Sequence, residues 1–147
     1  MLENLKVLDF TTLLPGPYAT FLLASMGAKV TKVSAPGKID LVLESGPRAS
    51  TGETANRIWL HHNKDEIFVD LKNKEGLRKI LKLIESGQYN CIFEQFRPGV
   101  MDKLGLGYKT VKEIAPDIVY VSISGYGQEG EYAMRAGHDI NLSLIHI

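Results

Sequence analysis

The sequence predicts an α/β fold in which a mostly parallel sheet has flanking helices. Short runs of β-forming residues alternate with helical stretches along the 147 residues, and this alternation is typical of parallel strands joined by helices. The length allows one domain with a proper hydrophobic core. Seventeen basic residues balance seventeen acidic ones without a long run of either sign, so we expect no nucleic-acid partner.

The first half of the chain contains three predicted strands, at residues 5–10, 28–33 and 67–71, because these runs are rich in β-forming residues. A helix is predicted at 18–26. It should be largely buried, since apolar residues occupy most of its circumference. The polar stretch 38–56 follows a Pro-Gly break and lacks a clear periodicity, so we expect a long surface loop there.

The second half begins with the clearest helix of the sequence, predicted at 74–85. Its apolar residues are spaced by three and four positions: Leu77, Ile80, Leu81 and Ile84. A strand is predicted at 89–93, a pair of helices between 100 and 115, and a last strand at 117–123. Right-handed crossovers would gather the loops that follow these strands along one edge of the sheet, where open α/β sheets bind ligands.

Several classes of protein and site are not expected. The N-terminus lacks the basic and apolar segments of a secretory leader, and no run approaches the roughly 18 apolar residues that span a bilayer. We therefore expect a cytoplasmic protein without a membrane partner. The single Cys91 lies in an apolar run and is interpreted as buried packing. His61 and His62 are adjacent and lack metal-ligand spacing, so no metal site is predicted.

A glycine-rich segment follows the last predicted strand. Residues Gly125 to Gly130 spell G-x-G-x-x-G, the dinucleotide-binding fingerprint. That fingerprint normally occupies the first strand-to-helix turn, which here contains Pro15 and Pro17 and so offers fewer backbone N–H groups to a pyrophosphate. An active-site loop that lets a ligand approach the backbone is favoured over dinucleotide binding, and a flexible turn remains the plain alternative.

His138 and Arg97 are the side chains with the most evident chemistry. An imidazole titrates near neutral pH and can both accept and return a proton, although His138 with Asp139 is also an ordinary helix start. The planar fork of Arg97 suits phosphate, and nearby lysines could add point charges to a polyphosphate site: Lys32, Lys72 and Lys103.

Ordered motifs along the chain carry a resemblance to a known family. They are Leu5 to Phe10, Pro15 to Pro17, Gly27 to Val33, Val69 to Lys72, Phe96 to Leu106, Ser124 to Gln128 and Gly137 to Asn141. Together they resemble the family III CoA-transferases, a group that includes formyl-CoA and carnitine CoA-transferases and α-methylacyl-CoA racemases. The resemblance implies a Rossmann-like large domain and, for the full-length protein, a homodimer of interlocked chains.

The resemblance also implies where coenzyme A binds. Family positions that hold coenzyme A match Val69, Asp70, Leu71, Lys72, Gln95, Phe96, Arg97, Lys103, Gly137, Asp139, Ile140 and Asn141. In this family an acyl-CoA thioester is the substrate, and no tightly bound cofactor is implied.

The catalytic role implied for His138 depends on the branch of the family. His138 matches a histidine that racemases use as one of two proton-transfer residues, the other being a downstream aspartate. Transferases instead use a downstream aspartate as nucleophile, and they commonly carry an aromatic residue at the position of His138. We therefore take a racemase or epimerase of 2-methylacyl-CoA as the first hypothesis. A CoA-transferase between an acyl-CoA and a carboxylic acid is the alternative, and an inactive CoA-binding fragment is the third.

Two departures from the family pattern matter. The family usually has an acidic residue after Val33, followed by a basic residue that contacts the CoA nucleotide; here Ser34 and Ala35 stand in these places, and Lys38 could substitute for the basic one. Family members are also more than twice as long, so we expect the chain to lack the catalytic aspartate and to be inactive. Residues 142–147 read like a translated sequencing adaptor. We expect 1–141 to form a truncated CoA-binding domain and 142–147 to be a non-native tail.

Overall fold

Five parallel strands form one sheet in the computed structural model, which describes residues 1–137. The strand order is β3-β2-β1-β4-β5, so the chain reverses its direction of travel across the sheet after β3. The strands are β1 (Lys6–Asp9), β2 (Lys29–Ser34), β3 (Lys64–Phe68), β4 (Cys91–Glu94) and β5 (Val119–Ser122). The predicted α/β class is therefore confirmed, and the sheet is entirely parallel.

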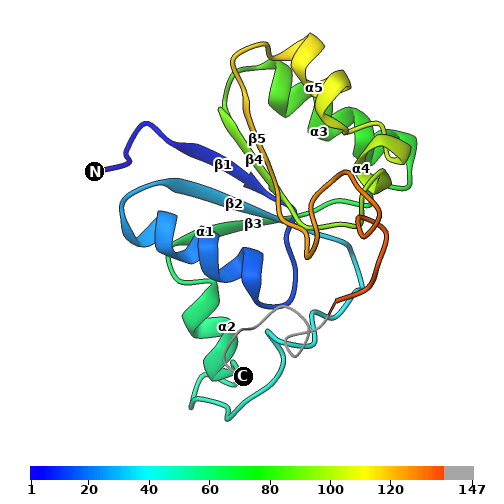
Figure 1. The fold of residues 1–147 in the computed structure, drawn as a ribbon. Helices are drawn as coiled ribbons and strands as arrows, with labels where there is room; N and C mark the ends of the chain where they lie inside the picture. The colour runs from blue at the N-terminus through cyan, green and yellow to red at the C-terminus, as the bar shows by residue number, and fades with distance from the viewer. Residues whose placement is uncertain (138–147) are drawn as a thin grey trace.

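Helices cover both faces of the sheet. Figure 1 shows α1 and α2 on one side and α3, α4 and α5 on the other, as right-handed crossovers require when the strand order reverses. The helices are α1 (Pro15–Ser25), α2 (Ala55–Leu60), α3 (Lys74–Glu85), α4 (Val100–Lys103) and α5 (Tyr108–Ile114). We call the two sides the α1–α2 face and the α3–α5 face.

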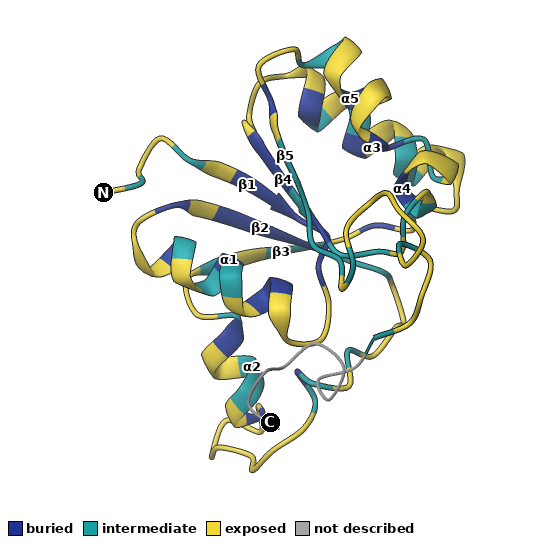
Figure 2. Ribbon diagram, viewed as in Figure 1, coloured by how far each residue is buried: buried dark blue, intermediate teal, exposed yellow. Residues whose placement is uncertain are grey.

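The larger hydrophobic core lies on the α3–α5 face. Its buried residues alternate along the strands with those of the opposite face, as Leu8 and Ile92 do, and they meet the apolar stripe of α3 at Ile80 and Ile84. A smaller cluster on the α1–α2 face contains Val7, Val30 and Cys91. Figure 2 shows these strands as the most deeply buried part of the chain.

Local signals explain where α3 begins and ends. The Asn73 side chain accepts hydrogen bonds from the backbone N–H groups of Glu75 and Gly76, at 2.8 and 3.1 Å, and so satisfies two donors that the first turn leaves free. Gly87 follows the helix with a φ of 69°, a conformation that glycine adopts without strain. The predicted bounds of this helix agree with the structure.

The structure differs from the sequence prediction in three elements. β3 lies at Lys64–Phe68 rather than at 67–71, because the charged residues that open it pair with β2 and are neutralised by neighbours on the α1–α2 face. The predicted surface loop 38–56 contains buried Leu43 and leads into α2, whose first turn is capped by Thr54. A six-residue helix presents too little periodicity to be recognised in the sequence.

The helix α1 is the third difference. It begins at Pro15 rather than at residue 18, because proline suits the first helical position, where its missing N–H has no partner to lose. It is also less buried than predicted, since Tyr18 and Leu22 each expose 42% of their surface. No helix among residues 1–137 is long and apolar enough to cross a membrane.

Candidate functional site

A pocket of about 540 Å³ opens at the carboxyl ends of the strands. Its walls come from the segments that follow β1, β2, β3 and β4, which is the edge where parallel α/β sheets bind ligands. The end of β2 and the residues after it contribute much of one wall, including Ser34, Ala35 and Lys38. Four segments that are far apart in the sequence thus meet in one concave site.

Five of the residues predicted to bind coenzyme A line this pocket. Four follow β3 directly, and the fifth follows β4: Val69, Asp70, Leu71, Lys72 and Phe96. Val69 is buried against the α3–α5 core, whereas Asp70 and Lys72 are exposed. The Asp70 carboxylate accepts a hydrogen bond of 3.0 Å from the backbone N–H of Lys72, so this turn is closed by its own side chain.

Other predicted residues lie outside the pocket walls. The Gln95 side chain accepts a hydrogen bond of 3.0 Å from the backbone N–H of Gly16, so it ties β4 to the start of α1. Arg97 and Lys103 are exposed and do not line the pocket. Gly137 is the last residue described. His138, Asp139, Ile140, Asn141 and the predicted tail 142–147 lie outside the described residues.

Sequence reasoning missed part of the site. Pocket residues that were not predicted as ligand contacts are Phe10, Thr12, Leu13, Val33, Ile39, Asp40, Leu41, Val100 and Leu104. The sequence contained a signal for Thr12 and Leu13, because both follow the first predicted strand and so belong to the ligand edge of the sheet. Ile39 and Leu41 lie in the stretch 38–56, which was predicted to be a polar surface loop, so neither was expected at a ligand site.

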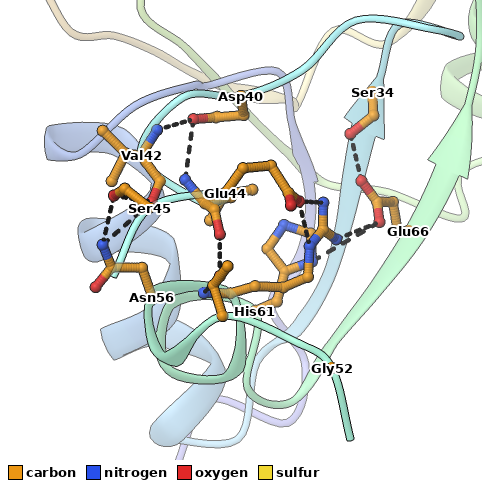
Figure 3. Close-up of polar contacts among 12 residues, drawn as sticks. Ser34, Asp40, Val42, Glu44, Ser45, Gly52, Asn56, His61 and Glu66 are labelled. Carbon is orange, nitrogen blue, oxygen red and sulfur yellow. Dashed lines mark hydrogen bonds and ion pairs between the residues drawn. The ribbon is translucent and has the colours of Figure 1, made fainter. Parts of the chain in front are cut away.

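A carboxylate lies beside Ser34, although position 34 itself is not acidic. The Ser34 hydroxyl donates a hydrogen bond of 2.5 Å to Glu66, which lies in register beside Lys32 on the neighbouring strand β3. Figure 3 shows the Glu66 carboxylate between Ser34 and a guanidinium group, that of Arg57. The carboxylate of Glu66 on β3 therefore lies beside position 34.

Arg57 joins this carboxylate to the segment that borders the pocket. Its guanidinium lies 3.4 Å from Glu66 and 3.1 Å from Glu44, and all three side chains are largely shielded from solvent. His61 lies at the edge of the same group, with Nδ1 3.9 Å from Glu66, and burial lowers its pKa below the ordinary value despite that carboxylate. These contacts hold α2 and residues 44–45 against β3.

The glycine-rich segment lies beyond β5 and is exposed. Gly127 and Gly130 have φ angles of 85° and 98°, so both glycines occupy conformations that other residues adopt only with strain. No helix follows this segment within residues 1–137, which removes the strand–turn–helix context of a dinucleotide fingerprint. Among the same residues, no group of three or more potential protein ligands could hold a metal ion.

Comparisons with known proteins agree with this architecture. The sequence profile of CoA-transferase family III matches residues 2–145. The chain belongs to CoA-transferase family III. It is 40% identical to an acyl-CoA transferase of Fusarium pseudograminearum over 99% of its length. It is 39% identical to the human succinyl-CoA:glutarate CoA-transferase over 98%.

A solved family structure has the same fold. The crystal structure of a CAIB/BAIF family protein from Brucella suis superposes with a TM-score of 0.84 at 32% identity, covering 95% of this chain and 37% of that one. The chain likewise spans 34% of the Fusarium protein and 32% of the human one. The chain therefore spans about a third of each of these three proteins.

Proposed function

We propose that the pocket holds the nucleotide end of coenzyme A and that the full-length protein is a CoA-transferase. The observation that carries the proposal is the pocket itself, at the ligand edge of the sheet, with five of the residues predicted to bind coenzyme A in its walls. Membership of CoA-transferase family III supports the choice of ligand.

The composition of the pocket suits an adenine nucleotide. Phe10, Val33 and Phe96 supply apolar wall for a base, and apolar walls with a few polar groups are usual for such ligands. Lys38 and Lys72 are exposed at the rim, where ammonium groups attract phosphate as point charges. Lys38 supplies a positive charge close to Ala35, where the family usually has its basic residue.

The names of relatives point to dicarboxylic acids as acceptors. Matching proteins are named for succinyl-CoA with glutarate, D-citramalate or mesaconate. For the full-length protein we propose succinyl-CoA as donor and a small dicarboxylic acid as acceptor. The racemase hypothesis depends on His138, which lies outside the described residues, and the matching names favour the transferase over it.

Calorimetric titration of the chain with coenzyme A tests the pocket. Replacement of Lys72 by alanine should weaken binding about fivefold to tenfold at low salt, because one ion pair with phosphate is lost. Lys74→Ala is the matched control, since Lys74 is also exposed but opens α3 outside the pocket walls. Equal effects of the two substitutions, or no binding to the unmodified chain, would refute the pocket assignment.

The reaction is tested with the full-length protein. Incubation with succinyl-CoA and glutarate, mesaconate or citramalate should give the new CoA thioester and free succinate, measured by chromatography. A racemase would instead exchange the α-proton of a 2-methylacyl-CoA with solvent deuterium. Deuterium incorporation without CoA transfer to any of the three acids would reverse the proposed assignment.

A further inference from the structure

The segment between β1 and α1, residues Thr11 to Leu14, borders the pocket without belonging to a helix or strand. Thr12 and Leu13 line the pocket wall. Leu13 has a φ of 61°, in the left-handed region that costs a residue with a branched side chain about 1 kcal/mol or more. Such a conformation persists only where surrounding contacts hold it. We call this segment the β1–α1 loop.

Asp9 holds the start of the β1–α1 loop. This residue is fully buried at the end of β1. One carboxylate oxygen accepts hydrogen bonds from the backbone N–H of Thr11 at 2.9 Å and from its hydroxyl at 2.5 Å. The other accepts from the Thr20 hydroxyl at 2.5 Å and lies 3.4 Å from the Lys64 ammonium. Asp9 therefore ties the loop to α1 and β3.

Lys32 holds the same peptide from its other side. It lies in register beside Asp9 on β2, exposes only 2% of its surface, and donates a hydrogen bond from Nζ to the carbonyl oxygen of Thr11. Burial lowers the pKa of this lysine, and the nearby Asp9 carboxylate partly offsets that effect. An amine held in this way differs from the point charge for phosphate that the sequence suggested.

Asp40 holds the strained end of the loop. One carboxylate oxygen accepts a hydrogen bond of 3.0 Å from the backbone N–H of Leu13. The other accepts from the backbone N–H of Val42 at 3.1 Å. Asp40 thus links two walls of the pocket, and Leu13 keeps its unfavourable φ with its N–H satisfied.

We propose that Asp9, Lys32 and Asp40 are positioning residues that set the backbone of the β1–α1 loop for ligand binding. Lys32 also lies in the pocket wall, and its positioning role is exerted through the Thr11 carbonyl. The identity of the ligand as coenzyme A rests on the function proposed above. The role of these residues in ordering the β1–α1 loop does not depend on which ligand binds.

The test compares Lys32→Met with Lys29→Met. Methionine keeps the length and apolar stem of Lys32 but cannot donate to Thr11, and Asp9 retains Lys64 as its cation, so we expect the variant to fold. Lys29 begins the same strand and is exposed, which makes it a matched control. Two quantities are measured for each variant: amide exchange by NMR and the affinity for coenzyme A by calorimetry.

In Lys32→Met, the amides of Thr11 and Leu13 should exchange at least tenfold faster, and binding of coenzyme A should weaken about tenfold. The amide of Phe10, which donates to the Phe93 carbonyl at 2.8 Å, should be unaffected. Lys29→Met should change neither quantity. Unchanged exchange at Thr11 and Leu13 in a folded Lys32→Met variant would overturn the proposal, as would faster exchange with undiminished affinity.

A second variant covers the case in which Lys32→Met does not fold. Asp40→Ala removes the acceptor of the Leu13 N–H together with that of the Val42 N–H, on a half-buried segment, and should accelerate exchange at Leu13 while weakening coenzyme A binding. A lower affinity for coenzyme A without faster amide exchange at Leu13 would assign Asp40 to direct ligand contact and overturn its positioning role. If the unmodified chain does not bind coenzyme A, the proposed ligand fails, and the exchange data alone still decide whether these residues order the loop.

Discussion

Lys64 and Asp9 form an ion pair from which solvent is completely excluded, with Nζ 3.4 Å from the carboxylate oxygen. The ammonium also donates to the carbonyl of Pro17 at 2.8 Å and to the hydroxyl of Thr20 at 2.7 Å. It therefore joins the first residue of β3 to the first turns of α1. A charged residue on the edge strand of the sheet becomes part of the interior through three polar contacts.

Replacing Lys64 by methionine should destabilise the chain by about 3 kcal/mol at pH 7, because it leaves the buried Asp9 carboxylate without its nearest cation. Urea unfolding followed by circular dichroism measures this loss. The double variant Asp9→Asn/Lys64→Met removes both charges and should lose clearly less than the sum of the two single variants. Additive losses would mean that the pair contributes nothing as a pair.

The pH dependence of stability provides a separate test. Burial lowers the pKa of Lys64 from 10.5 to about 8, so between these values the unfolded chain binds more protons than the folded one. Stability from this group therefore rises with pH from about 8 to about 10.5, by at most about 3 kcal/mol, and is constant below pH 8.

Other buried groups act in the opposite direction at alkaline pH. Burial raises the pKa of Cys91 to about 11 and that of Tyr120 above its ordinary value, so both groups cost stability as the pH rises through their unfolded pKa values. The difference in unfolding free energy between the unmodified chain and Lys64→Met isolates Lys64. That difference should grow between pH 8 and 10, and a flat difference would show that Lys64 has an ordinary pKa.

Gly76→Ala should destabilise the chain by about 2 kcal/mol, although alanine normally favours a helix. A Cβ at this position would overlap the carbonyl oxygen of Asp70, which is backbone and cannot rotate away. Thermal unfolding measures the loss. Lys79→Ala in the same helix is exposed and should change stability by less than about 0.5 kcal/mol. A more stable Gly76→Ala variant would show that α3 can shift without cost.

Leu13→Asn should stabilise the chain by up to about 1 kcal/mol, because asparagine tolerates the left-handed φ of 61° better than leucine does. Leu13 is 46% exposed, so only part of its apolar surface is lost from burial. Leu41→Asn, at a more exposed position without a positive φ, should bring no gain. If both substitutions have the same effect on the melting temperature, backbone strain at Leu13 is not the cause.

Periodicity predicted the elements that pack by hydrophobic contact alone. The helix at 74–85 carries its apolar stripe and its Asn73 cap in the sequence itself, and the order of strands and helices was sufficient for the α/β class. β3 was placed three residues too late, because its first residues are charged and their burial depends on Asp9 and Arg57, which are distant in sequence. A local sequence pattern does not show which distant residues will neutralise a charged side chain.

The candidate site was predictable to the same extent. Val69 to Lys72 and Phe96 follow strands and match motifs, and they line one pocket. Lys32 lines the same pocket, but its hydrogen bond to the Thr11 carbonyl was not predictable, because that bond depends on which strands are neighbours. Asp40 belongs to none of the motifs, and only the fold shows that its carboxylate accepts the hydrogen bond from the Leu13 N–H.

The hydrogen bond between Ser34 and Glu66 constrains which residues the two positions can carry together. A glutamate at position 34 would place two carboxylates on neighbouring strands within contact distance, and the like charges would repel each other in a half-buried setting. Neither position can therefore change alone without cost. Substitutions at positions 34 and 66 should be inherited as a pair, so that an acidic residue at one position accompanies a neutral residue at the other.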